Sequence, residues 1–375
     1  MYLARLHLRD YRNFAEQVLE LPPQGVAIIG DNGQGKTNLL EAIYYLEIFR
    51  SFRGAPDEQL VRFGEEVFRV EGRLLAPDGT ERSVAAAFER RRRRKKVTVD
   101  GAEPERLGDA LGRVGAVIFS PSDVELVAGG PGQRRRFLDI VLSLADRGYL
   151  AALQRYRQAL FQRNTLLRQG SPAELVAAWN EGLVASGSRV VAARARWVAE
   201  SREGFAEHYA RVAGGQPGSV AFVSSIPELP DAPSADDIAG GFREQLERTA
   251  ERERVRGMTL VGPHRDDLRF TTTGEDGVPL DLRTYGSGGQ QRTAAIALRM
   301  VEAETIRQTR GRESVILLDD VFAELDPGRS RRIIEWIDAA EGGQVILTSP
   351  KPADVQIHGD TLPRWRMEGG VVRTA

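Results

Sequence analysis

Eight consecutive residues of this chain have the pattern of a phosphate-binding loop. Residues 30–37 read Gly-Asp-Asn-Gly-Gln-Gly-Lys-Thr, which fits G-x-x-x-x-G-K-[ST] between an apolar run and a predicted helix. Glycines let successive backbone N–H groups face phosphate oxygens, and the start of a helix adds positive potential. The lysine reaches the β- and γ-phosphates and the threonine ligates Mg²⁺. We expect ATP or GTP with Mg²⁺ to bind Gly30, Asp31, Asn32, Gly33, Gln34, Gly35, Lys36 and Thr37.

A second candidate feature is a pair of acids at the end of an apolar run. Residues 315–318 are Val-Ile-Leu-Leu, typical of a buried parallel strand, and Asp319 and Asp320 follow. We expect Asp319 to hold Mg²⁺ and Asp320 to orient or deprotonate the attacking water. Related ATPases more often carry glutamate at the second position, and because aspartate is one methylene shorter we expect slow hydrolysis. Two acids that merely end a strand are the alternative.

A third feature is the string Ser287-Gly288-Gly289-Gln290, which leads into a predicted helix from Thr293 to about Arg307. A serine and backbone N–H groups at a helix start form an anion site. Because the chain already has a phosphate loop, this second site indicates a nucleotide bound to a partner molecule. On its own the string would be an ordinary turn. Its position in the sequence, between the phosphate loop and the acid pair, favours a role in nucleotide binding. Asp326 follows the acid pair and is expected at the same interface.

Composition sets broad limits. The chain has 375 residues, enough for two to three domains, with 52 basic and 53 acidic side chains. A DNA-binding surface therefore requires local segregation of charge. The chain has no cysteine, which excludes disulfides and thiolate chemistry and fits a cytoplasmic protein. No apolar run is long enough to span a membrane and no secretory signal is recognisable, so we expect no membrane association.

The order of predicted elements indicates an α/β body with a helical insertion. Short strands are expected up to about Phe119, around residues 6–8, 26–29, 66–75, 82–88, 97–99 and 114–119, and one helix follows the phosphate loop. Residues 131–212 have helical spacing of apolar side chains. A short strand near 220–223 and a helix over 237–254 follow, and the α/β body is expected to resume near Thr259.

These motifs resemble the ATP-binding-cassette superfamily, specifically the heads of SMC-like ATPases, and among them the RecF family of DNA replication and repair proteins. The resemblance covers nearly the whole chain. It includes the strings at 8–14, 119–127, 134–139, 162–167 and 262–268 as well as the ATPase motifs, in the family's order. It implies a P-loop ABC/SMC-type ATPase head with an inserted α-helical lobe, divided as 1–128, 129–256 and 257–375.

The same resemblance implies a function. It predicts a weak, DNA-stimulated ATPase that forms an ATP-dependent homodimer and binds DNA at gap junctions, single-stranded or double-stranded. The implied partners are RecR-like and RecO-like mediators, and the implied processes are recombinational repair, replication-gap processing and the SOS response. Arg12 is added as a residue that contacts nucleotide, and Arg53 is a further candidate.

The chain departs from the family pattern at two places. Gly288 stands where the family commonly has glutamine. Glycine lacks the side chain but keeps the backbone N–H donors, so we expect the Ser287–Gln290 string to keep its function. Thr348 follows the predicted strand 344–347 where many related ATPases carry a histidine that senses the γ-phosphate, and Thr348 is only a candidate for that role. The glutamine of the metal-sensing loop is not identified, and the turn from Ser120 to Asp123 is the expected region.

Several charged clusters remain open in function. Residues 90–96 are seven consecutive cations before the turn Asp100-Gly101, expected as one arm of a hairpin that is mostly solvated or contacts DNA. Arginines 134–136 either form a charged seam or contact DNA. His264, Arg265, Asp266 and Asp267 favour structural ion pairs over a nuclease metal site, since adjacent acids on a strand point to opposite faces.

Two other functions share the nucleotide motifs. One is the ATPase subunit of another ABC-type machine such as a membrane transporter, which the inserted lobe disfavours. The other is an assembly module that binds ATP without hydrolysing it.

Overall fold

The computed structural model describes residues 1–227, 229–230, 233–274, 276–339, 343–350 and 362–373. The chain divides into two compact units. Unit 1 comprises Met1–Asp123 and Glu302–Ala375, and unit 2 comprises Val124–Val301. Unit 2 contains the predicted inserted lobe and also residues 257–301, which we expected in the resumed body. The three-part division by function stays a prediction.

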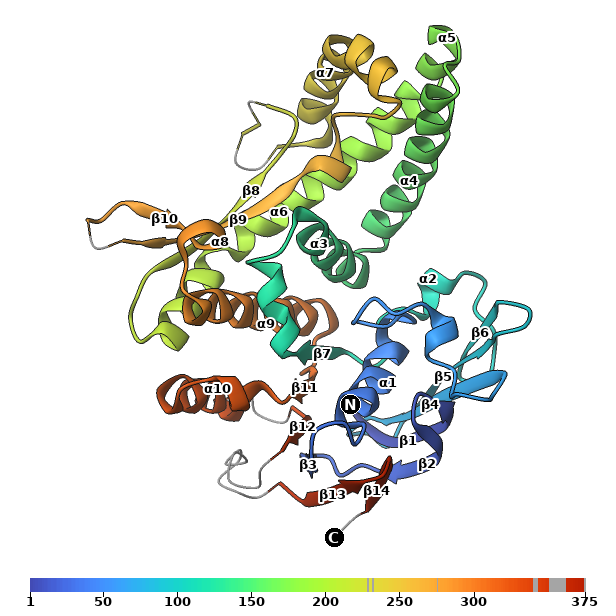
Figure 1. Cartoon of the computed structure of the whole chain (residues 1–375), viewed down its shortest axis with the longest axis vertical. Helices are drawn as coiled ribbons and strands as arrows, with labels where there is room; N and C mark the ends of the chain where they lie inside the picture. Colours follow the sequence, from blue (N-terminus) through green and yellow to red (C-terminus); the bar gives the residue numbers. More distant parts are fainter. Residues whose placement is uncertain (228, 231–232, 275, 340–342, 351–361, 374–375) are drawn as a thin grey trace. The chain divides into compact units, whose positions relative to one another are not determined.

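A largely parallel sheet of six strands, in the order β14-β13-β3-β12-β11-β7, positions the predicted site in unit 1. Its strands are β3 (Gly25–Ile29), β7 (Ala116–Phe119), β11 (Val315–Asp319), β12 (Val345–Ser349), β13 (Arg364–Glu368) and β14 (Val371–Arg373). The central strands are buried on both faces because helix α1 (Lys36–Ile48) and helix α10 (Pro327–Ala339) lie on opposite sides (Figure 1). The ring of Trp336 in α10 packs against Phe119.

An antiparallel sheet of five strands completes unit 1, in the order β2-β1-β4-β5-β6. Its strands are β1 (Tyr2–Tyr11), β2 (Phe14–Glu20), β4 (Val67–Leu75), β5 (Glu81–Glu89) and β6 (Arg94–Val99). Helix α1 contacts strands of both sheets, which explains why it is buried on nearly every side. Short helical turns η1 (Asp57–Gln59) and α2 (Leu107–Ala110) lie in the connections.

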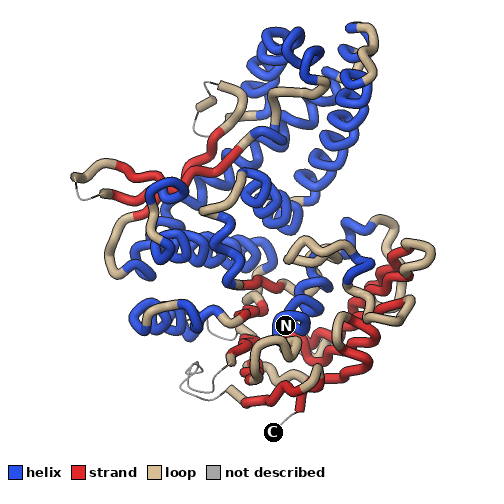
Figure 2. The backbone as a smooth tube through the Cα atoms, in the orientation of Figure 1, coloured by secondary structure: helices blue, strands red, loops and turns tan. Residues whose placement is uncertain are grey.

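Unit 2 is mainly helical, as Figure 2 shows. Its helices are α3 (Pro131–Ala145), α4 (Arg147–Arg168), α5 (Ala173–Ala177), α6 (Asn180–Ala213), α7 (Ala235–Arg256), α8 (Leu282–Tyr285) and α9 (Gly288–Arg310), which continues into unit 1. A three-stranded antiparallel sheet joins β8 (Gly218–Val223), β9 (Asp267–Thr273) and β10 (Pro279–Asp281). Two turns, η2 (Pro121–Leu126) and η3 (Pro263–Arg265), precede α3 and β9. Apolar side chains from α3, α4, α6, β8, β9 and α9 form one core.

Buried ion pairs connect distant segments of unit 2. Arg134, almost fully buried, binds the carboxylate of Asp267 through two nitrogens, and Arg135 donates to the carbonyl of Asp266. Arg194 contacts Asp139 at 2.8 Å and Asp266 at 3.3 Å. Removing one partner of such a pair leaves an uncompensated buried charge. The predicted structural pairing at residues 264–267 is confirmed, because the two neighbouring acids are bound to different arginines.

A second such connection joins α4 to α7. Arg163 contacts Glu253 at 2.7 Å, and both side chains are buried. The backbone N–H of Thr259 donates to the side chain of Asn164 at 2.8 Å. No helix among the described residues is both long enough and apolar enough to cross a membrane.

Candidate nucleotide site

The phosphate loop lies at the carboxyl edge of the parallel sheet. Strand β3 ends at Ile29, the loop follows, and α1 begins at Lys36. The Lys36 ammonium donates to the carbonyl oxygens of Gly30 at 2.8 Å and Asp31 at 3.2 Å, and to Oδ1 of Asn32 at 3.4 Å. These contacts fold the lysine back over the loop, where its charge faces the space that the backbone encloses. The strand, the loop and the helix start follow one another as the sequence pattern predicts, and the contact of Lys36 with phosphates stays a prediction.

Asn13, which follows β1, supports the loop from outside, and the sequence analysis gave it no role. Its amide donates to the carbonyl of Gln34 at 3.0 Å and accepts from the amide of Asn38 at 2.8 Å. Gly35 has φ of +108°, and a Cβ at this position would lie 2.3 Å from the Asn13 side chain. Position 35 therefore requires glycine for two reasons: the backbone has a positive φ, and the Asn13 side chain leaves no room for a Cβ.

The acid pair lies beside the loop because β11, β12 and β3 are parallel neighbours. The hydroxyl of Thr37 donates to Oδ1 of Asp319 at 2.9 Å. Burial raises the pKa of Asp319 to about 6; the carboxylate of Asp320 adds to this rise, while hydrogen bonds from Thr37 and Thr348 oppose it. Hydroxyl and carboxylate oxygens are the ligands that Mg²⁺ prefers, so both residues fit the predicted metal.

Asp320 has the geometry of a strained and incompletely satisfied group. Its backbone has φ of +47°, a left-handed conformation uncommon for residues other than glycine. Oδ2 lies 3.5 Å from the ammonium of Lys36, whereas Oδ1 is buried and has no hydrogen-bond partner among the described residues. Buried carboxylate oxygens without a partner are rare. Oδ1 is therefore a free acceptor for a water molecule beside the phosphate loop.

Thr348, at the end of β12, fixes the acid pair. Its hydroxyl accepts a hydrogen bond from the backbone N–H of Asp320 at 3.1 Å. The same hydroxyl lies 3.1 Å from Oδ1 of Asp319 and 3.3 Å from the carbonyl of Leu318, and it donates to one of them. The side chain is fully buried. With its hydroxyl engaged in this way, Thr348 positions the acids, and a direct contact with a γ-phosphate finds no support.

Arg12 makes a paired contact with the fully buried Glu41 of α1. Its Nε and Nη2 lie 2.8 and 3.1 Å from the two carboxylate oxygens, and Nη1 donates to the carbonyl of Gln59 at 3.2 Å. Ser51 donates to the same carboxylate. Three of the guanidinium donors are thus engaged within unit 1, and a nucleotide contact of Arg12 stays a prediction. Arg53 is exposed and contacts Oδ1 of Asn38 at 3.4 Å.

The string 287–290 lies in unit 2 and caps α9. Oγ of Ser287 accepts from the backbone N–H of Gln290 at 3.2 Å, and the Gln290 side chain accepts from the N–H of Ser287 at 2.9 Å. This reciprocal pair is a capping box. The N–H groups of Gly288 and Gly289 have no hydrogen-bond partner among the described residues, and a Cβ at Gly288 would meet open space. The capped helix start therefore keeps two free donors, and glutamine would fit at position 288.

Two other predicted features have local structural roles in unit 1. Asp326 caps α10: its Oδ1 accepts from the N–H of Arg329 at 3.0 Å and its Oδ2 contacts the Arg329 guanidinium. The turn 120–123 follows β7, the neighbour of β11, at the carboxyl edge of the sheet. Oδ2 of Asp123 accepts from the N–H of Ser120 at 2.8 Å. No glutamine lies in this turn.

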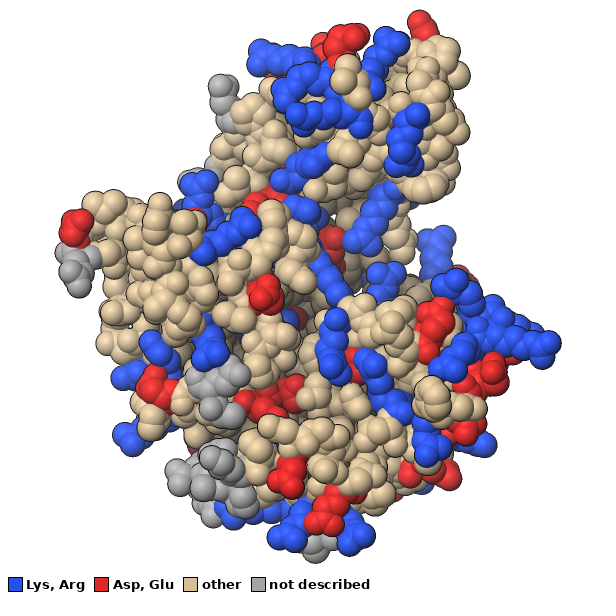
Figure 3. Space-filling model, in the orientation of Figure 1, with Lys and Arg blue, Asp and Glu red and all other residues tan. Residues whose placement is uncertain are grey.

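The seven cations 90–96 lie at the β5–β6 hairpin, where Lys and Arg gather on the surface (Figure 3). Residues 90–93 form its turn and only 94–96 belong to β6, whereas we expected all seven on one arm that leads to the turn at Asp100. Most of its cations have acidic neighbours in unit 1: Arg92 with Glu89, Arg93 with Glu58, Lys95 with Asp57 and Lys96 with Glu103. Arg91 and Arg94 are exposed and form no ion pair among the described residues. The hairpin thus offers two uncommitted cations to an anionic partner.

The parallel sheet, the phosphate loop and the adjoining acid pair define a P-loop ATPase of the ABC and SMC-head class. A protein-family profile described as "AAA domain, putative AbiEii toxin, Type IV TA system" matches residues 26–353. The DNA replication and repair protein RecF of Salinibacter ruber is 37% identical over 357 residues, 94% of this chain and 85% of the relative. The chain belongs to the RecF family.

Solved structures agree with this assignment. A structure of the recombination mediator protein RecF with ATP is 31% identical, covers 100% of this chain and 97% of that chain, and superposes with a TM-score of 0.89. A Smc head domain from Pyrococcus furiosus is 16% identical, covers 100% of this chain and 96% of that chain, and has a TM-score of 0.57, which shows a shared fold. The predicted family and fold class are confirmed, and the transporter alternative is not supported.

Proposed function

We propose that this chain is an ATP-gated DNA-binding protein that acts in recombinational repair, in the processing of replication gaps and in SOS induction. The observation that carries the proposal is the convergence of Lys36, Thr37 and the acid pair at one edge of the sheet. The relationship to RecF supplies the biological setting. RecR-like and RecO-like mediators are the proposed protein partners, and gap junctions are the proposed DNA.

The residues fit a magnesium-bound nucleotide. The loop offers backbone N–H groups and the Lys36 ammonium to phosphate oxygens, while Thr37 and Asp319 offer hard oxygen ligands 2.9 Å apart. Bound MgATP supplies the transferable γ-phosphoryl group and a cation that neutralises its charge. The chain itself holds the phosphates in place and excludes water around the buried Lys36 and Asp319 side chains.

Asp320 is the proposed general base. Its uncommitted Oδ1 accepts a hydrogen bond from water, and the Lys36 ammonium, 3.5 Å from Oδ2, orients the carboxylate from the other side. Thr348 fixes the backbone of Asp320, so the carboxylate cannot move toward the water to compensate for its short side chain. These features favour slow turnover, which suits a timer of DNA release.

The capped start of α9 is the proposed contact with a second copy of the chain. Ser287 retains its hydroxyl proton while its oxygen accepts from Gln290, and the donors of Gly288 and Gly289 are free within the described chain. Three donors at a helix N-terminus suit an anion such as the terminal phosphate of the partner's nucleotide. ATP then favours the dimer by its higher affinity for the paired state, and hydrolysis removes that preference.

The test is DNA binding in each nucleotide state. Fluorescence anisotropy of a labelled gapped duplex is measured without nucleotide, with ADP and with ATP and Mg²⁺. We expect ATP to tighten binding in the wild type and not in Lys36→Met. Asp320→Asn should keep the ATP effect, lose about 100-fold or more in turnover and release DNA more slowly.

An acid variant far from the loop in the sequence serves as the control. Asp236→Asn, at an exposed position near the start of α7, should behave as wild type in DNA release and turnover. DNA affinity that is equal in all nucleotide states would contradict gating. Turnover that survives in Asp320→Asn would remove Asp320 from the mechanism, and absent turnover in the wild type, with ATP bound, would favour the assembly-module alternative.

A further inference from the structure

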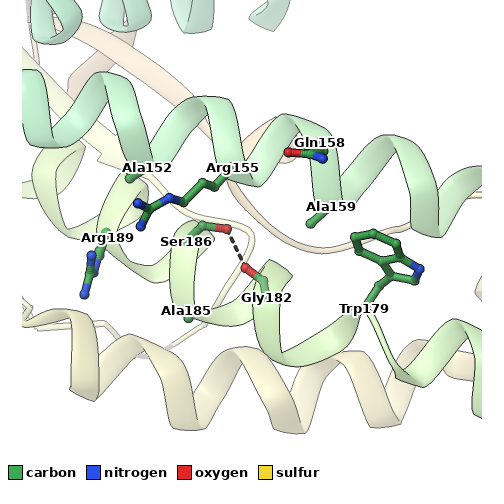
Figure 4. Close-up of a pocket in the computed structure, with 9 residues that line it drawn as sticks. All are labelled: Ala152, Arg155, Gln158, Ala159, Trp179, Gly182, Ala185, Ser186 and Arg189. Atoms are coloured by element: carbon green, nitrogen blue, oxygen red, sulfur yellow. Dashed lines mark hydrogen bonds between the residues drawn. The ribbon is translucent and has the colours of Figure 1, made fainter.

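A groove of about 380 Å³ runs along unit 2 between α4 and α6. None of the residues that line it belongs to the candidate nucleotide site. Its floor consists of small residues, which are Ala152, Ala159, Gly182, Ala185 and Ser186 (Figure 4). The hydroxyl of Ser186 donates to the carbonyl of Gly182 at 2.6 Å, so its proton is not available to a ligand. The floor is consequently apolar and suits an apolar side chain.

Two arginines lie at one end of this floor. Arg155 of α4 and Arg189 of α6 both line the groove, and both side chains are exposed (Figure 4). Neither forms an ion pair among the described residues, and no acid lines the groove. By contrast Arg157, close to Arg155 in α4, is engaged with Asp139 at 2.7 Å. The groove therefore combines an apolar floor with two uncommitted positive charges.

Trp179, which precedes α6, lies at the other end (Figure 4). The helix rise places Trp179 about 15 Å from Arg189 along the axis of α6. An extended peptide covers that length with about five residues. An aromatic or aliphatic side chain of such a peptide would contact the indole and the alanines, and carboxylates four or five residues further along would reach the arginines.

We propose that this groove is a docking site for an acidic, apolar-anchored peptide segment of a partner protein. Charge complementarity and the apolar floor together specify the occupant. A nucleic-acid strand fits less well, because a DNA strand carries one charge per roughly 3.4 Å along its whole length and the groove offers two cations at one end only. The floor also offers few hydrogen-bonding groups to bases and sugars; among the described uncharged lining residues, only the Gln158 amide and the Trp179 indole N–H have polar side-chain groups without a hydrogen bond.

The test uses the full chain and a library of random octapeptides displayed on phage. We expect enrichment of sequences that hold one aromatic or large aliphatic residue and at least two acids. A labelled synthetic copy of the most enriched octapeptide is then titrated by fluorescence polarisation. The double variant Arg155→Ser and Arg189→Ser should bind it about tenfold more weakly, consistent with loss of two exposed ion pairs. Ala185→Phe, which fills the groove, should also weaken binding.

Arg196→Ser is the matched control, since Arg196 is an exposed arginine of α6 that does not line the groove. It should leave peptide affinity unchanged, and all variants should keep wild-type ATP turnover, so a failure here is separate from a failure of the nucleotide mechanism. Circular dichroism and the unfolding midpoint confirm that the variants fold.

Two results would overturn the proposal. One is a library selection with no acidic and apolar enrichment, or a peptide whose affinity is equal in wild type and in the double variant. The other is an oligonucleotide of twelve thymidines whose affinity falls in the double variant and not in Arg196→Ser, which would assign the groove to single-stranded DNA.

Discussion

The hydroxyl of Thr37 donates to the carboxylate of Asp319 at 2.9 Å, although 282 positions separate the two residues. One belongs to the start of α1 and the other to the end of β11. The parallel arrangement of β3, β12 and β11 brings these ends to one edge. This contact joins the two halves of the nucleotide motif within unit 1, between the two oxygens that we propose as ligands of Mg²⁺.

Thr37→Val should remove one of these oxygens without a large change in volume. We expect the affinity for Mg²⁺ during ATP binding to fall by roughly 10- to 100-fold or more. This is the range found when metal sites lose a supporting group. Thr37→Ser keeps the hydroxyl and should remain close to wild type. Titration of Mg²⁺ against a fluorescent ATP analogue measures the effect. Equal Mg²⁺ dependence in the valine and serine variants would show that Thr37 is not a ligand.

Thr348→Val tests whether Thr348 positions the acids or senses phosphate. Because the buried hydroxyl binds the N–H of Asp320 and lies against Asp319, valine should lower both folding stability, by about 1–3 kcal/mol, and turnover. Thr348→Ser should restore both. Urea unfolding and single-turnover hydrolysis are measured on the same samples. A valine variant of full stability with no turnover would instead indicate a phosphate sensor.

Arg12→Met should act mainly through the fold. It leaves the fully buried Glu41 without its cationic partner, and breaking a buried pair costs about 3–5 kcal/mol. The double variant Arg12→Met with Glu41→Gln should recover part of that stability. Nucleotide affinity, measured at a temperature where both variants are folded, separates the two roles. An affinity loss that persists in the stabilised double variant would support the predicted nucleotide contact.

His264 predicts a pH dependence of stability in unit 2. Burial lowers its pKa to about 4, with the nearby cations Arg265, Arg135 and Arg194 acting in the same direction. The neutral ring fits its contacts, because Nε2–H donates to the carbonyl of Thr259 and Nδ1 accepts from the hydroxyl of Tyr156.

The sign of this effect follows from the two pKa values. The unfolded chain binds a proton below pH about 6.5 and the folded chain only below about 4, so stability present above pH 6.5 is lost as the pH falls toward 4. Between pH 7 and pH 5 the loss is about 2 kcal/mol. His264→Gln should flatten this dependence in urea unfolding at the two pH values. An unchanged slope would show that the ring titrates normally.

Local patterns were sufficient to predict much of the nucleotide site. The sequence predicted the loop 30–37, the start of α1 and the acids at the end of β11, because each motif lies within one strand, turn or helix start. Conformation at Gly35 and the capping role of Ser287 also follow from short-range chemistry. The roles of these residues in catalysis and in binding a second chain stay predictions.

Long-range partners could not be read from the sequence. Asn13 supports the loop from the turn after β1, and Thr348 holds the acids from β12, because the order of strands in the sheets brings them there. The family resemblance rested partly on the sequence strings around Arg134, Arg163 and Asp267. In the structure these three residues form buried ion pairs within unit 2. The sequence analysis did not predict strands β2, β9, β10, β13 and β14 or helix α10. In β2 the apolar residues Ala15 and Val18 are exposed, which breaks the alternation, whereas β13 alternates but spans only five residues.

The most direct test of ATP-driven pairing is the solution mass by light scattering, with and without ATP and Mg²⁺ and with and without gapped DNA. We expect the wild type to change from 41.4 kDa to twice that mass with ATP. Lys36→Met and Ser287→Arg should remain monomeric. Ser234→Arg removes the comparable capping box of α7 and should still dimerise, which separates the loss of a cap from the loss of the interface. A wild type that stays at 41.4 kDa with ATP, both with and without DNA, would contradict the account.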